Sequence, residues 1–504
     1  MEPRADLVDK TRYSVLTVCK LWRDLLLRTP EFWANALGRL LCFWHNDEIG
    51  EHDAHIKLHL ELSRTQPLNL RLFRLPRPAF QMFAAQAYRI ASVEVSVTLK
   101  QVAWLNRLLG VGMPLLCKLV ISHIEDDSFT IPLIAISTSK LPQLRSLEVR
   151  EYSLFDINGT FSRLRQLSLD SSYSGGYPVT INAFLDLLSL CAALVSLTLV
   201  ELNLRTPGLH GDGHRVVSLP HLRECSIQDR RWTYASTVLS WILVPSTCSV
   251  CLPCAGANFQ VLLPADTSSF PPISAADSVE YCFMQSATIA ATLKTYANGS
   301  PLLHMGVYRG KTEAFPRITM ELADLFAPYS RNIHALSIDS SLSRPFCADK
   351  KTRPALRYLL HRLRHITTLR LPGHDAVDVL SALGKPPPPK KIVCPRLEHL
   401  CIGWTDKPSM TDLAGPDAFA SFCDALVGVL ESRGTKGLRL RTLSISVHRS
   451  PRGYGAEVWD EAISVQEAWL RNRLEGLVSQ DITVDCAVAE ETPAVVTVRS
   501  DSED

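Results

Sequence analysis

A short pattern of apolar residues recurs along most of the chain and constrains its fold more than any other feature. The pattern is Leu-x-x-Leu-x-Leu, in which Ile, Val or Cys replaces Leu in some copies. Copies begin at Leu116, Leu144, Leu164, Leu194, Leu222, Ile333, Ile366, Leu397 and Leu440, and the copy at Leu222 is weaker than the others. Apart from one long break, the middle apolar residues are about 20 to 45 residues apart, a range that overlaps the spacing of leucine-rich repeats and extends beyond it.

The alternation within each copy predicts a short strand with one buried side. One repeat cannot bury that side alone, so the copies are expected to stack as a parallel sheet. Two stretches between the strands have apolar residues at helical spacing. These residues are Ile181, Phe184, Leu185 and Leu188, and Phe419, Phe422, Leu426 and Leu430. Strands that alternate with helices indicate right-handed crossovers and a curved α/β solenoid. The asparagine of a regular leucine-rich repeat is absent, so we expect an irregular array.

Residues 228–330 interrupt the rhythm of the repeats. Alternating apolar residues still occur there, around Val250 and again around Tyr281. We interpret the stretch as diverged repeats rather than a separate domain, with a Ser/Pro loop at 265–277. Asn298-Gly299 is expected to form a turn.

A different pattern precedes the repeats. Val15, Cys19, Trp22 and Leu26 recur every three or four positions, as on one face of a helix. Thr29-Pro30 then predicts a stop and a restart, because Pro disfavours helical geometry in the residue before it but is well tolerated at the first position of a helix. The second helix would present Phe32 and Trp33 as large apolar anchors.

These residues resemble the second half of an F-box, in the form common in large fungal families. The shared pattern is Val18-Cys19-x-x-Trp22-Arg23-x-Leu25, a spacer, and Thr29-Pro30-x-x-Trp33. The resemblance continues to about residue 75 through Pro67-Leu68-x-Leu70-x-Leu72. It implies binding to a Skp-type adaptor on a cullin scaffold. The residues expected to bind the adaptor or to stabilise the hairpin are Val18, Cys19, Trp22, Leu26, Pro30 and Trp33. The alternative is a hydrophobic helical hairpin packed on its own domain.

The first part of an F-box, a Leu-Pro-x-Glu-[Ile/Leu]-Leu helix, has no counterpart in this sequence. Met1–Asp6 leave no room for it upstream of Trp22. Either the chain start is truncated or this copy has lost part of its adaptor-binding surface. We expect the chain as written to bind a Skp-type adaptor weakly or not at all.

Together these patterns predict an α/β chain with a small N-terminal helical F-box-like segment followed by an irregular leucine-rich-repeat solenoid. The expected parts are a partial F-box-like segment at 1–44, a helix and strand transition at 45–100, the solenoid at 101–488 and a disordered acidic tail at 489–504.

Composition excludes several classes of partner. A net charge of +2 over 504 residues gives no bulk attraction to nucleic acid or to an anionic membrane. No apolar window has the length of a membrane span, and the first residues do not resemble a signal peptide. The 14 cysteines are scattered, mostly within apolar runs, as in reduced proteins. We therefore expect the cytoplasm or the nucleus.

The residues that could support chemistry do not form a convincing site. Cys248, Cys251 and Cys254 have zinc-like spacing, but a second pair of ligands is missing and strand alternation would point Cys248 and Cys251 to opposite sides. His361 and His365 lack the glutamate that follows the first histidine in zinc proteases. We expect no cofactor, no metal and no enzymatic activity.

The sequence leaves two functions open. The first is a non-catalytic substrate receptor of an SCF-type (Skp–cullin–F-box) ubiquitin ligase, which binds an unidentified protein target through its repeats. The second is a leucine-rich scaffold that has lost F-box function and acts without the adaptor.

The cysteine pattern leads to a first prediction. The purified protein should carry well below one zinc ion per chain, and chelators should not destabilise it, because an isolated triplet on an alternating strand cannot form a closed site. Elemental analysis checks this. Stoichiometric zinc that is lost in Cys251→Ser would contradict it.

Overall fold

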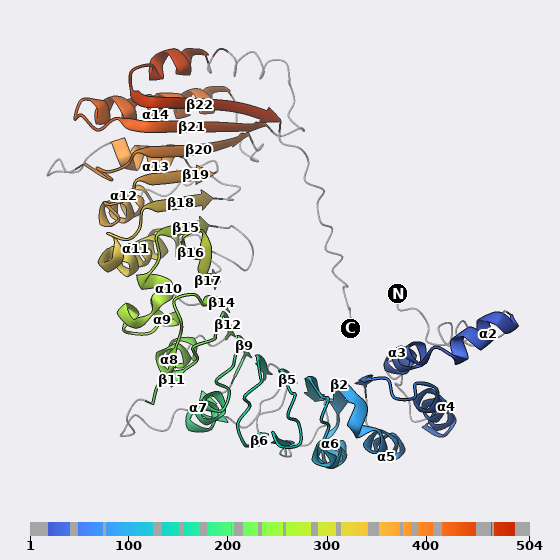
Figure 1. The fold of residues 1–504 in the computed structure, drawn as a ribbon. Helices are drawn as coiled ribbons and strands as arrows, with labels where there is room; N and C mark the ends of the chain where they lie inside the picture. The colour runs from blue at the N-terminus through green and yellow to red at the C-terminus, as the bar shows by residue number, and fades with distance from the viewer. Residues whose placement is uncertain are drawn as a thin grey trace, which may run out of the picture. The chain divides into compact units, whose positions relative to one another are not determined.

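A computed structural model shows a mixed α/β chain built on mostly parallel sheet (Figure 1). The structure describes residues 19–40, 49–73, 77–123, 134–150, 155–171, 179–202, 204–205, 215–229, 234–255, 259–283, 291–308, 314–340, 352–372, 376–384, 392–406, 416–449, 465 and 468–488. The expected tail at 489–504 lies outside these residues. The chain divides into two compact units, 1–248 and 249–504.

The main sheet of the first unit is entirely parallel. In sheet order its strands are β1 (Leu68–Leu72), β2 (Ile90–Val97), β3 (Lys118–His123), β5 (Ser146–Arg150), β7 (Gln166–Asp170), β9 (Ser196–Val200) and β12 (Glu224–Gln228). Each repeat copy between Leu116 and Ile227 thus forms one strand, as predicted from the alternation.

Both helices and short strands lie on the side of the first unit that faces away from its main sheet. The helices are α4 (Ile49–Leu62), α5 (Arg77–Ala85), α6 (Leu99–Val111), α7 (Ile181–Ser189) and α8 (Ala235–Trp241). The short parallel pairs are β4 (Ile134–Ser137) with β6 (Phe155–Asn158), β8 (Val179–Thr180) with β10 (Leu204–Arg205), and β11 (Val217–Ser218) with β13 (Ile242–Leu243). Ile181, Phe184, Leu185 and Leu188 are buried on α7, which confirms the predicted helical face.

The sheet of the second unit contains one antiparallel section. In sheet order its strands are β14 (Ser249–Ala255), β17 (Ser300–Tyr308), β16 (Ala291–Ala297), β15 (Ser278–Phe283), β18 (Ala335–Ser340), β19 (Thr368–Pro372), β20 (His399–Asp406), β21 (Leu440–Arg449) and β22 (Val478–Val488). β16 is antiparallel to both of its neighbours, whereas the other pairs are parallel.

The interpretation of 228–330 as diverged repeats is therefore wrong for β16 and β17. Asn298 and Gly299 both have positive φ, 50° and 79°, and they join the two strands as a tight hairpin in which Ala297 pairs with Ser300. The hairpin lies between β14 and β15 in the sheet, so these two strands do not pair with each other. The turn at Asn298-Gly299 was predicted, but the pairing that it produces was not. The expected loop at 265–277 contains a short helix, α10 (Pro271–Ser274).

Helices cover one side of the second sheet. They include α9 (Phe259–Leu262), α11 (Ala314–Phe326), α12 (Thr352–Arg362), α13 (Ala376–Gly384) and α14 (Pro416–Gly434). From α11 to α14 each helix packs against the next, and Figure 1 shows them stacked beside the strands. Helix α14 begins at Pro416, as the Gly-Pro signal predicted, and its Phe422, Leu426 and Leu430 are buried.

The middle leucines of the repeats form continuous columns. In the first unit Leu119, Leu147, Leu167 and Leu197 pair in register across neighbouring strands, and each is at most 1% exposed. The second unit repeats this arrangement in its own sheet. Its column consists of Leu336, Leu369, Leu400 and Leu443. The burial that the pattern predicted is confirmed.

At most of the repeat strands, a backbone ladder continues the sheet by one residue before the strand begins. The carbonyl of Cys117 accepts from the amide of Arg145, whose own carbonyl accepts from Arg165. The same bonds continue to Val195 and Arg223. In the second unit they link Asp277, His334, Thr367, Glu398 and Arg441 in turn.

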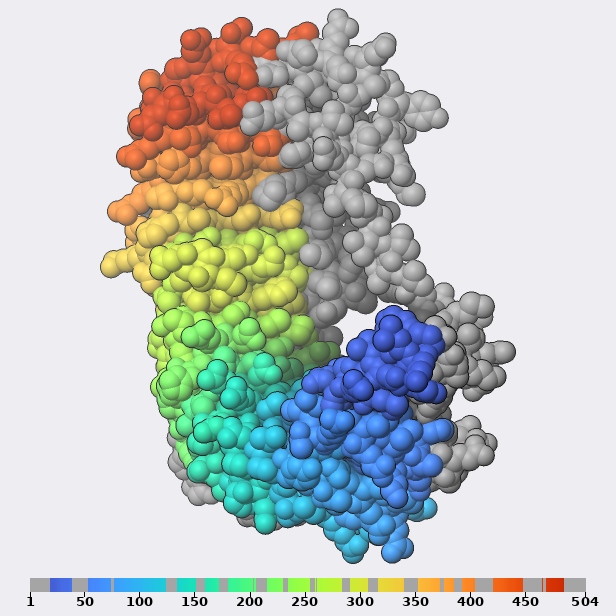
Figure 2. Space-filling model, turned by 45° about the vertical axis from the view of Figure 1, so that its right-hand side comes forward, coloured from blue at the N-terminus to red at the C-terminus, as the bar shows by residue number. Residues whose placement is uncertain are grey.

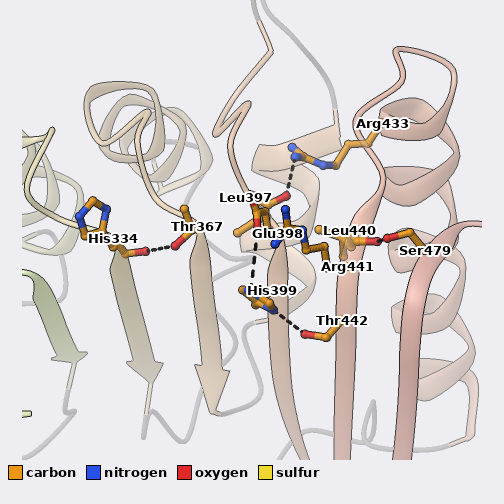
Figure 3. Close-up of polar contacts among 10 residues, drawn as sticks. All are labelled: His334, Thr367, Leu397, Glu398, His399, Arg433, Leu440, Arg441, Thr442 and Ser479. Carbon is orange, nitrogen blue, oxygen red and sulfur yellow. Dashed lines mark hydrogen bonds and ion pairs between the residues drawn. The ribbon is translucent and has the colours of Figure 1, made fainter.

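Side chains reinforce this ladder in the second unit (Figure 3). The Thr367 hydroxyl donates to the His334 carbonyl at 3.1 Å. In α14, buried Arg433 donates to the carbonyls of Val393, Cys394 and Leu397 at 3.1 to 3.3 Å. Burial lowers the Arg433 pKa, but the three carbonyls give its charged form hydrogen bonds in the turn before β20.

The leucine columns lead to a prediction about stability. Leu147→Ala, Leu197→Ala, Leu369→Ala and Leu400→Ala should each cost about 2 to 5 kcal/mol, because each removes a fully buried side chain and leaves a cavity. Hydrogen exchange should show the loss concentrated in the altered repeat and its neighbours. Ser168→Ala, on the other side of β7, is the control and should change local stability by less than about 0.5 kcal/mol. Equal effects of Leu147→Ala and Ser168→Ala would contradict the column.

Candidate functional site

The N-terminal hairpin consists of α2 (Lys20–Leu27) and α3 (Pro30–Leu40). The periodicity predicted a helix that included Val15 and Cys19, but the structure begins α2 at Lys20. Cys19 is instead the N-cap, and its Sγ accepts from the Trp22 amide at 3.4 Å. Val15 and Val18 lie outside the described residues.

The turn between the helices follows the predicted stop and restart. Helix α2 ends at Leu27, and half-buried Pro30 opens α3. The Thr29 hydroxyl donates to the Leu25 carbonyl at 2.8 Å, so it ties the turn to the end of α2. Glu31, in the first turn of α3, accepts from the Gln66 amide group at 2.8 Å.

Trp33 is the anchor of the hairpin. Its side chain is 3% exposed, and its Nε1 donates to the Leu26 carbonyl at 2.8 Å. The indole also packs edge-on against the ring of His59 in α4, with ring centroids 5.1 Å apart. Leu26 is 8% exposed. Of the residues expected in the site, Leu26 and Trp33 therefore hold the hairpin together.

A buried arginine fixes the segment that supports the hairpin. Arg89 donates to the Ser63 hydroxyl and to the carbonyls of Leu60 and Gln66, at 2.9 to 3.0 Å. These groups belong to the end of α4 and the turn that leads into β1. Burial lowers the Arg89 pKa, and the C-terminus of α4 provides a favourable environment for its charge.

Helix α3 packs very closely on the first strand. A Cβ at Gly38 would lie 2.4 Å from the carbonyl oxygen of Asn69 in β1, a backbone atom that cannot move aside cheaply. Within the described residues β1 is the outer strand of its sheet. Helix α3 therefore covers that end of the sheet, where exposed backbone groups would otherwise invite non-specific pairing.

The remaining side of α2 is apolar and exposed. Leu21, Trp22 and Leu25 are 78%, 50% and 54% exposed. Leu25 follows Trp22 by three residues and Leu21 by four, so it is a neighbour of both on the helix surface. We refer to these three residues as the α2 apolar cluster. In the space-filling view α2, the darkest blue segment, lies at the molecular surface (Figure 2).

Of this cluster, the residues expected to bind the adaptor include only Trp22, although Leu25 also belongs to the F-box-like pattern. The missed signal is that α2 is apolar at Leu21, Trp22, Leu25, Leu26 and Leu27. A two-helix hairpin buries only one face of such a helix, so the other face must remain accessible.

The cysteine triplet does not form a site in the described residues. Cys248 is fully buried, which raises the pKa of its thiol to about 12. Cys251 lies on the other side of the sheet, with its Sγ 3.9 Å from Nδ1 of His304. No group of three His, Cys, Asp or Glu side chains in the described part of the chain could hold a metal ion. Among the described helices, none has the length and apolar character needed to cross a bilayer.

Comparisons with known proteins do not assign the chain to a family. No protein-family model matches the sequence, and a search of curated proteins finds no significant match.

The two tryptophans should respond very differently to truncation. Trp33→Ala should cost about 3 to 5 kcal/mol and increase hydrogen exchange in α3 and α4, because it empties a buried site. Trp22→Ala should change stability by less than about 1 kcal/mol, because its side chain is half exposed. Hydrogen exchange measured by mass spectrometry checks both. Similar protection in the two variants would contradict the assignment of inner and outer faces.

Proposed function

We propose that this chain is a non-catalytic substrate receptor of an SCF-type ubiquitin ligase, acting in the cytoplasm or nucleus. Its F-box-like hairpin would bind a Skp-type adaptor, and an irregular leucine-rich-repeat solenoid would bind the protein target. The observation that carries the proposal is the exposed α2 apolar cluster of Leu21, Trp22 and Leu25. An accessible apolar cluster with a central tryptophan has the composition of a protein-interaction hot spot.

The hairpin supports this role because one of its faces is buried against the fold and the other is exposed. Leu26 and Trp33 bury the inner face, and α3 is fixed on β1 through the close approach at Gly38. Helix α2 is thus attached to a fixed support and needs little rearrangement to meet a partner, which lowers the entropic cost of binding.

The proposed contribution to ubiquitin transfer is proximity. A receptor that holds a target near the conjugating enzyme raises the effective concentration of the target lysine without taking part in the bond change.

A second candidate is an adaptor-independent scaffold. The observation that favours it is the cover that α3 gives to β1, because this cover gives Trp33 and Gly38 a structural role that needs no partner. It does not explain the exposure of Leu21, Trp22 and Leu25.

Titration of a purified Skp-type adaptor into the full chain separates the two candidates. Trp22→Ala should weaken binding at least tenfold, which corresponds to about 1.4 kcal/mol, and Leu25→Ala should weaken it as well. Leu243→Ala is the matched control, because Leu243 in β13 is 52% exposed and distant in sequence. Equal affinity of Trp22→Ala and wild type would exclude the α2 apolar cluster as the contact. If the wild-type chain does not bind any Skp-type adaptor, the scaffold is the better description.

A further inference from the structure

A shallow cavity of about 280 Å³ lies between α3 and the polar side of the first three strands. Asn35 contributes from α3, and Asn69 and Arg71 from β1. Ser92 and Glu94 line it from β2, and Lys118 lines it from β3. All of these residues belong to the first unit.

The sheet register brings the polar side chains together. Asn69 pairs with Ser92, and Ser92 pairs with Lys118, so the three stand in one row across adjacent strands. They point away from the buried side because Leu70, Val93 and Leu119 are buried at the intervening positions. Strands about 4.8 Å apart place the ends of this row roughly 10 Å from each other, a span that suits a small polar group.

The charges of the cavity do not cancel. Arg71 Nε lies 3.0 Å from the Glu94 carboxylate, so these two residues neutralise each other. Lys118 has no ion pair, and the side chains of Asn35, Asn69 and Ser92 make no hydrogen bond within the part of the chain that the structure describes. One net positive charge and a set of uncommitted donors therefore face the same space.

We propose that this cavity binds a carboxylate of a protein or peptide partner. Lys118 would supply the charge, and the amide groups of Asn35 and Asn69 would donate to the carboxylate oxygens. A metal cation would be repelled by Lys118. A phosphate dianion would find only one unpaired cation, whereas a carboxylate matches the single charge. The proposal does not depend on adaptor binding, because no residue of the cavity belongs to α2.

Four octapeptide libraries provide the test, each randomised without Asp or Glu and passed over the immobilised full-length chain at fixed ionic strength. The first has free C-terminal carboxylates, the second is C-terminally amidated, and the third is amidated with a central aspartate. We expect about tenfold greater retention of the first or third library over the second. Which of the two is retained identifies the source of the carboxylate. A fourth library, amidated with a central phosphoserine, tests the choice of carboxylate over phosphate.

Variants connect the retention to the cavity. Lys118→Met should abolish the preference, and Asn35→Ala should reduce it. Lys100→Met changes an exposed lysine of the same unit on α6 and should have no effect. Glu94→Gln should strengthen retention about threefold or more, because it removes a repelling charge and releases Arg71. This gain of binding cannot result from misfolding.

Three outcomes would overturn the proposal. They are equal retention of the first three libraries, a preference that survives in Lys118→Met, and retention of the phosphoserine library alone. None of them bears on the α2 apolar cluster, so failure here leaves the adaptor titration unaffected.

Discussion

The carbonyl group before most of the repeat strands accepts from the amide of the next repeat, and the rest of the architecture depends on this bond. This bond fixes the register between neighbouring strands. Leu147 therefore pairs with Leu119 and Leu167 rather than with polar residues. A slip of one residue would turn the whole leucine column to the polar side. The backbone hydrogen bonds and the buried leucine column therefore favour the same register, because any other register would lose both the bonds and the burial.

A stacked array of this kind has to protect its outer strands. In the first unit α3 covers β1, and the close approach at Gly38 leaves no room for a larger side chain. In the second unit Arg471 donates to the carbonyl of Val484 in β22, the last strand in sheet order. The hairpin of α2 and α3, which resembles an interaction module by sequence, therefore also stabilises the fold. Packing within the hairpin accounts for its inner residues Leu26 and Trp33, and only the accessible face of α2 is available to a partner.

Sequence alone could predict the elements that depend on local pattern. Each Leu-x-x-Leu-x-Leu copy became a strand because alternation and burial act over six residues. The position of the β16–β17 hairpin within its sheet depends on pairing partners far away in sequence, which Asn298-Gly299 does not encode. The same limit applies to the sites. Trp22 was found by its spacing, but whether Leu25 or Leu26 faces inward depends on where α3 packs. The cavity at Lys118 arises from three strands in register and could not be seen in any one of them.

The alternation of the strands also separates stability from recognition. Polar positions on one side of the first sheet carry small, partly exposed residues. They include Ser92, Ser146, Ser168, Ser196 and Ser226. Replacing such a residue alters the surface without disturbing the leucine column behind it, so this side can acquire binding specificity at little cost in stability. Near β1 the surface is no longer flat, because α3 forms a wall beside it. Helix α3 and Lys118, which has no ion pair within the described residues, together define a ligand more narrowly than an open sheet does, and they meet only at the first three strands.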